Sequence, residues 1–168
     1  MKLTFDLRLP DFEEVSDRGH ARSHKAAGTA VADWFIKERV QKRFDGSMKG
    51  ELMWAPRDER YERNKQRRGF GAGKPHFYTG ATASKFKKAT PRVSKRFVGI
   101  RVAGLGPQYN RFDANFSKKK GGRQVMKLRQ EIARLSDAEG ARAAEIYASV
   151  YVAAMQDELM KARQQTIR

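Results

Sequence analysis

The stretch Ser136-Asp137-Ala138-Glu139 decides the fold, because it is a helix-start signal followed by a long apolar pattern. In such a capping box the Ser136 hydroxyl accepts the amide hydrogen of Glu139, and the Glu139 carboxylate reaches back to the Ser136 amide. Apolar residues then recur at helical spacing, namely Ala143, Ile146, Tyr147, Val150, Tyr151, Ala154, Met155 and Leu159. The pattern predicts a helix over 137–163, about 40 Å long at the α-helical rise per residue.

A second helical pattern lies upstream, over 16–45. Its apolar positions recur three and four residues apart, as expected for one buried helix face; they are Ala27, Ala30, Val31, Trp34 and Phe35. Cations near the end suit the carbonyl end of the helix dipole, and Gly46 is a natural stop. We interpret the Trp34 stripe as core packing.

Strand patterns are shorter. Residues 2–9 alternate strictly between apolar and polar, which is typical of a strand with one buried face, and Pro10 ends the pattern, so we expect an N-terminal strand or arm over 1–10. Val98, Ile100 and Val102 share one face of a central strand expected over 90–103. The glycine-bearing, basic stretch 108–123 has neither period and predicts a long mobile loop.

Length and composition set the class of protein. A chain of 168 residues without cysteine can form one hydrophobic core without disulfides, so we expect a single domain over 1–168. The elements predict an α+β fold, with long N-terminal and C-terminal helices packed on a small, mainly antiparallel sheet with long basic loops. No apolar run approaches the roughly 20 residues of a membrane span, and we expect no signal peptide and no membrane partner.

The charge is concentrated in the middle of the chain. The net charge is +17, and residues 57–129 hold 21 basic and 4 acidic residues, whereas the two ends are nearly neutral. Unpaired cations cannot be buried, so this segment must face water, an acidic protein surface or a nucleic acid. The composition leaves all three open.

We find no pattern that predicts catalysis. His20 and His24 are four residues apart, like metal ligands on one helix face, but without a third ligand a surface pair is the better interpretation. The glycine loop at 69–74 is one residue short of a phosphate loop, and Pro75 stands where that motif has Ser or Thr. The middle segment has too few carboxylates for paired-carboxylate hydrolysis. We therefore expect no enzymatic activity, no cofactor and no metal.

The order of features over residues 44–86 is more specific. Phe44-Asp45-Gly46 closes a helix, Trp54-Ala55-Pro56 follows, and a basic stretch and a glycine loop lead to Lys74-Pro75-His76-Phe77-Tyr78-Thr79-Gly80. This order resembles the virion-morphogenesis, or tail-completion, proteins of tailed bacteriophages. The resemblance implies an α+β subunit that assembles as a ring, which we expect to be hexameric, at the head–tail junction or the top of the tail.

The same resemblance implies partners and contact residues. The partners would be copies of the chain, neighbouring neck or tail proteins, and DNA passing through the channel. The protein would act in the virion, after assembly in the host cytoplasm, as a tail terminator or a neck protein. The residues expected at partner or inter-subunit contacts are Trp54, Arg57, Tyr61, Lys65, Arg68, Lys74, Thr79, Lys118, Lys119, Lys120 and Arg123.

A nucleic-acid-binding protein, ribosome-associated or architectural, is the alternative. Aromatic residues are interleaved with the basic ones between Phe70 and Phe116, where they could stack on bases or form the core of a small sheet. No helix-turn-helix, zinc-finger or ribonucleoprotein signature accompanies them.

Overall fold

The computed structural model describes residues 2–3, 15–48, 51–52, 59–69, 81–104, 132 and 134–166. The chain divides into two compact units. The first comprises Met1, Phe35–Thr90 and Arg101–Arg134, and the second comprises Lys2–Trp34, Pro91–Ile100 and Leu135–Arg168. The combination of long helices with a small sheet confirms the expected α+β class. The expectation of a single domain stays a prediction.

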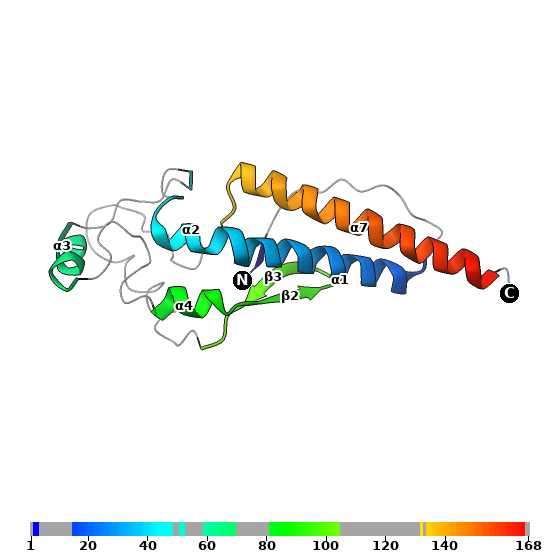
Figure 1. The fold of residues 1–168 in the computed structure, drawn as a ribbon, viewed down its shortest axis with the longest axis horizontal. Coiled ribbons are helices and arrows are strands. Elements are labelled where there is room, and N and C mark those ends of the chain that lie inside the picture. The colour runs from blue at the N-terminus through cyan, green and yellow to red at the C-terminus, as the bar shows by residue number, and fades with distance from the viewer. Residues whose placement is uncertain are drawn as a thin grey trace. The chain divides into compact units, whose positions relative to one another are not determined.

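Two long antiparallel helices dominate the second unit (Figure 1). They are α1 (Asp17–Trp34) and α7 (Asp137–Thr166). The buried face of α7 repeats every four residues, at Glu139, Ala143, Tyr147, Tyr151 and Met155. On α1 the facing positions are small, at Gly19, Ser23 and Ala27, so the tyrosine rings of α7 have room to pack. The helix predicted over 137–163 is therefore confirmed, and it continues three residues further.

The capping box forms as predicted. The Glu139 amide donates to Ser136 Oγ at 3.2 Å, and the Ser136 amide donates to Glu139 Oε2 at 3.1 Å. The Glu139 side chain is only 2% exposed, so its carboxylate is buried by this arrangement. Both bonds satisfy amide groups that the first helical turn leaves without partners.

A three-stranded sheet lies against the other side of α1 (Figure 1). The strands are β1 (Lys2–Leu3), β2 (Thr90–Ser94) and β3 (Phe97–Arg101), in the spatial order β1-β3-β2. β1 pairs antiparallel with β3, with Leu3 opposite Val98. Leu3, Val98 and Ile100 are all buried and form the apolar face of the sheet.

The helix and the sheet meet most closely at Gly28 in α1. A Cβ atom at this position would lie 2.8 Å from Val93 Cγ1 and 2.9 Å from Val98 Cγ2, which is closer than side chains pack. Only glycine leaves space for these two branched side chains, so Gly28 sets the separation between α1 and the sheet.

In the first unit the same long helix continues through a π-helical turn, η1 (Phe35–Arg39), into α2 (Val40–Asp45). The buried positions Phe35, Val40 and Phe44 are five and then four residues apart. The five-residue step is typical of a π turn, which adds one residue to a helical turn. The helix expected over 16–45 is thus present but interrupted. Gly46 ends it in the left-handed conformation, at φ 91°.

Arg43 fixes the segment before α7 onto α2. Its guanidinium is fully buried, and it donates to the carbonyl oxygens of Ile132 at 2.9 Å and Arg134 at 2.8 Å. A third bond reaches the Arg39 carbonyl at 3.2 Å, and the guanidinium lies 4.5 Å from the centre of the Phe35 ring. The planar fork of arginine suits this bridging of several acceptors.

Two short helices complete the described part of the first unit, α3 (Glu59–Arg67) and α4 (Ala81–Lys87). Phe86 of α4 packs its ring 5.4 Å from the ring of Phe44 in α2. No helix was expected from the sequence over the residues of α4.

The strand expected over 90–103 is wrong as a single element. The chain turns at Lys95 and Arg96, and two strands of five residues pair across this turn. The alternation predicted for Val98 and Ile100 is confirmed, because both are buried while Arg101 is exposed. Of the strand expected over 1–10 only Lys2–Leu3 is described, and the loop expected over 108–123 lies outside the described residues.

Candidate functional site

Two histidine–tyrosine pairs connect α1 and α7 in the second unit. His20 Nδ1 lies 2.7 Å from the Tyr151 hydroxyl, and His24 Nδ1 is hydrogen-bonded to the Tyr147 hydroxyl. The Tyr147 and Tyr151 rings stack with their centres 5.7 Å apart. The four side chains form a ladder along the helix interface, so His20 and His24 are half-buried rather than the surface pair that we expected.

His24 uses both of its ring nitrogens. Nε2 lies 2.8 Å from the Ser94 carbonyl oxygen, which can only accept, so Nε2 carries the hydrogen. In the neutral ring Nδ1 is then an acceptor, and it receives the hydrogen of the Tyr147 hydroxyl. His24 therefore joins α1 to both α7 and β2 and has no lone pair left for a metal ion.

The tyrosine side of the ladder is held in its neutral form. Burial, with a smaller contribution from the neighbouring Tyr151, raises the pKa of Tyr147 to about 12. Burial also raises the pKa of Tyr151. Ionised phenols would be poorly solvated between the helices, so both tyrosines take part in this interface in their neutral, hydrogen-bonding form.

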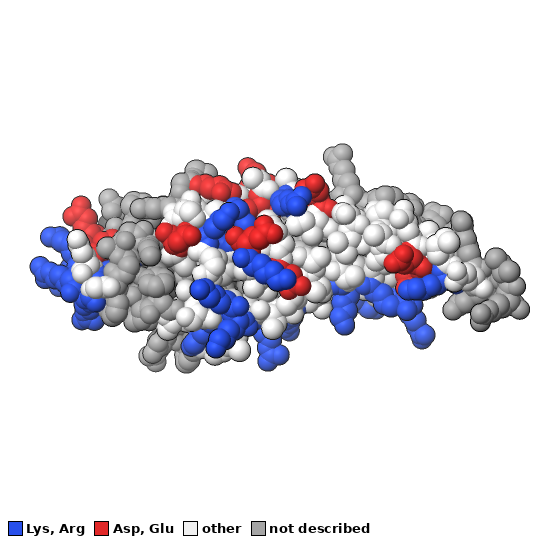
Figure 2. Space-filling model, in the orientation of Figure 1, with Lys and Arg blue, Asp and Glu red and all other residues white. Residues whose placement is uncertain are grey.

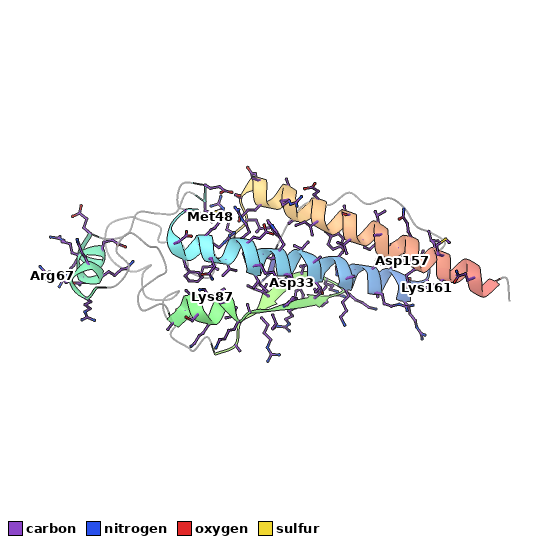
Figure 3. All side chains as sticks on the ribbon, in the orientation of Figure 1. Asp33, Met48, Arg67, Lys87, Asp157 and Lys161 are labelled. Carbon is purple, nitrogen blue, oxygen red and sulfur yellow. The ribbon has the colours of Figure 1, made fainter. Side chains whose placement is uncertain are left out.

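At the far end of the ladder an ion-pair network continues the interface. Glu158 of α7 lies 3.0 Å from Arg22 of α1 and 3.1 Å from Lys161. Lys161 and Asp157 are labelled near the end of α7 in Figure 3. The two cations are largely exposed, so the network contributes little stability and mainly fixes the register of the two helices.

The strongest candidate for a functional region is the basic segment 81–104, whose residues belong partly to the first unit and partly to the second. It holds seven basic residues and no acidic residue, and all seven are exposed; they are Lys85, Lys87, Lys88, Arg92, Lys95, Arg96 and Arg101. None of them forms an ion pair with another described residue. Lys87 on α4 is labelled in Figure 3.

The part of this segment that lies in the second unit is the β2–β3 hairpin. We call it the basic hairpin because it carries three exposed cations, Arg92, Lys95 and Arg96. Lys95 and Arg96 form the turn, and the Arg92 guanidinium lies 5.5 Å from the centre of the Phe97 ring. Figure 2 shows Lys and Arg side chains that project below β2 in this view. β2 is an edge strand, and Pro91 removes one backbone donor from it, which protects the edge against strand addition.

Three of the site residues expected from sequence lie within α3 or directly after it. Arg68 is exposed, as expected for a docking cation. Lys65 is not: its side chain is 0% exposed, and its Nζ lies 3.5 Å from Glu62 Oε1. The dense charge of residues 57–68 predicts an exposed helical turn or two; the helix is present as α3, but the expected exposure is wrong at Lys65. Tyr61 belongs to α3.

The remaining expected site residues lie outside the described residues. They are Trp54, Arg57, Lys74, Thr79, Lys118, Lys119, Lys120 and Arg123.

Comparison with known proteins gives no match: no family model, no curated protein and no solved structure is similar to the chain. Across the described ranges, no group of three or more His, Asp or Glu side chains could hold a metal ion. In the same part of the chain, no helix combines the length and apolarity that crossing a membrane requires.

Arg92 and the turn cations Lys95 and Arg96 were not among the contact residues expected from the sequence. They belong to the basic middle of the chain, but a single strand over 90–103 would have distributed them over two faces. One sequence signal could have predicted them: residues 81–104 contain seven Lys and Arg residues and no Asp or Glu.

Proposed function

We propose that the chain is a structural subunit of a tailed-bacteriophage virion, at the head–tail junction or the top of the tail. In this role it assembles as a ring and docks to neighbouring virion proteins as a tail-completion, tail-terminator or neck protein. The proposal starts from the resemblance over residues 44–86, and the observation that carries it further is the exposed, acid-free basic segment 81–104.

A docking role fits this surface better than a chemical one. Arg92, Lys95 and Arg96 are exposed within one hairpin that carries no acidic residue, so they repel one another in the isolated chain, and a negatively charged partner relieves that repulsion. Complementary charge speeds encounter and sets the register of two surfaces. The histidines of the second unit are the side chains most suited to chemistry, but they are engaged in the helix interface.

The direct test is electron microscopy of the purified full-length chain, with size-exclusion chromatography coupled to light scattering. We expect ring-shaped particles of defined mass, with assembly weakened by salt. A chain that stays monomeric at every accessible concentration contradicts the proposal.

A second test uses Trp54→Ala, because the resemblance places Trp54 as an anchor in the core or between subunits. We expect this variant to lose assembly and to lower the yield of infectious, tailed particles in a phage that carries it. Normal particle yield from Trp54→Ala counts against the proposal.

The nucleic-acid-binding protein is the rival to be distinguished. It predicts sub-micromolar binding of DNA or RNA by a chain that forms no ring, with affinity that falls steeply as salt rises. Ring formation with the expected mass excludes a solely nucleic-acid-binding role.

A further inference from the structure

We propose that the basic hairpin, Arg92, Lys95 and Arg96, binds the phosphate backbone of double-stranded DNA without reading its sequence. This inference deepens the proposed function by naming the partner of one surface. The inference rests on the proposed function in one respect: the head–tail junction or the top of the tail is where the protein would meet DNA.

The charge of the hairpin is available to a partner. Arg92, Lys95 and Arg96 are exposed, and no described residue forms an ion pair with any of them. Two of the three cations stand in a two-residue turn, so they project from the end of a paired backbone rather than from a mobile tail. The hairpin is anchored, because Val93 and Val98 pack against Gly28 of α1 and Ser94 is hydrogen-bonded to His24.

The surroundings favour phosphate over an acidic protein. Tight protein interfaces depend on a few large apolar or aromatic anchors that become buried at the centre of the contact. Among the described residues the exposed large hydrophobic side chain is Met160, which lies on α7 and not on the hairpin. Phosphate binding requires no such anchor, because exposed cations release counterions from the nucleic acid.

The aromatic residue of the hairpin favours a duplex over a single strand. Proteins bind single strands largely by stacking bases on exposed aromatic rings. Phe97 is half-buried, and the Arg92 guanidinium lies over its ring. A duplex presents its phosphates outward and keeps its bases stacked internally, so it matches a surface that offers cations alone.

The test compares two variants of the full-length chain with equal change in charge. One carries Arg92→Gln, Lys95→Gln and Arg96→Gln. The matched control carries Arg18→Gln, Lys37→Gln and Lys42→Gln, which are exposed cations on the long N-terminal helix. Binding to a fluorescent duplex of random sequence is measured by anisotropy from about 50 to 200 mM salt, the range in which phosphate contacts dominate. Circular dichroism verifies that both variants fold.

We expect the hairpin variant to lose about tenfold in affinity per lost contact at about 50 mM salt, and its salt slope to fall by about 0.9 per contact. The control should keep most of its affinity and its full slope. A double variant, Lys95→Gln with Arg96→Gln, leaves the contact between Arg92 and Phe97 intact. Because it loses two of the three contacts, the logarithm of its affinity loss and the change in its salt slope should both be about two thirds of those of the triple variant.

An equal loss of duplex affinity in the hairpin variant and the control overturns the inference. An unchanged salt slope of the hairpin variant also overturns it. Polyglutamate that competes as well as duplex DNA at equal charge assigns the surface to an acidic protein instead. Single-stranded DNA that binds more tightly through the same residues overturns the assignment to a duplex. Ring formation is scored separately: rings without duplex binding overturn this inference alone, and duplex binding without rings overturns the proposed function alone.

Discussion

The close approach of Val93 and Val98 to Gly28 gives the sharpest prediction, which concerns the variant Gly28→Ala. The added methyl would lie 2.8 Å from Val93 Cγ1 and 2.9 Å from Val98 Cγ2, whereas ordinary contacts begin near 3.4 Å. Both neighbours are β-branched and stiff at χ1, so α1 or the sheet must shift. Gly140→Ala in α7 is the matched control, because a Cβ there meets nothing within 4 Å.

The expected magnitude follows from two opposing terms. Alanine is favoured over glycine in a helix by about 0.8–1.0 kcal/mol, and both variants gain this. Overpacking a well-filled site costs about 1–3 kcal/mol, and only Gly28→Ala incurs it. Gly140→Ala should therefore be stabilised, and Gly28→Ala should be about 1–3 kcal/mol less stable than that control.

Urea unfolding followed by circular dichroism measures this difference, provided that the m-values agree. Adding Val93→Ala to Gly28→Ala should recover part of the loss, because it removes the nearer methyl, with a coupling energy of about 0.5–3 kcal/mol. Equal stability of the two single variants would refute the proposed contact between α1 and the sheet.

Three further predictions concern single side chains. Arg43→Lys should cost about 2–4 kcal/mol in urea unfolding, because an ammonium group cannot reach all three carbonyl oxygens that the buried guanidinium bridges; a loss below about 1 kcal/mol contradicts the bridging role. The pKa of Tyr147 is raised to about 12, above the ordinary 10.0 of tyrosine, so the native state keeps the proton longer and stability should fall as pH rises from about 10 to about 12. Tyr147→Phe should reduce that slope, and an unchanged slope would assign it to other groups. Ser136→Ala should lose about 1 kcal/mol, seen in the urea midpoint, and an unchanged midpoint would show that the capping box is not needed.

The elements that could be predicted from sequence are those with local signals. The capping box at Ser136 and the left-handed Gly46 are recorded in a few adjacent residues, and both form as expected. The long helices follow from apolar spacing. The hairpin was missed because Lys95-Arg96 lacks the glycine or asparagine that usually marks a two-residue turn.

The parts that could not be predicted depend on residues far apart in the chain. The spacing of His20 and His24 places both on one helix face, but their tyrosine partners are 131 and 123 residues away. Lys65 could not be predicted for a related reason. It lies in a densely charged stretch that suggests exposure, but in the fold its side chain is buried beside Glu62. Charge density alone therefore identifies a basic segment but not which of its cations reach solvent.

The bridging guanidinium of Arg43 has a consequence for the chain entropy that folding must overcome. It joins α2 to a backbone carbonyl 89 residues later, and closing a segment of that length costs about 4 kcal/mol of chain entropy. The α1–α7 interface closes a still longer one. These contacts therefore have to offset that chain entropy before they add to the stability of the native state.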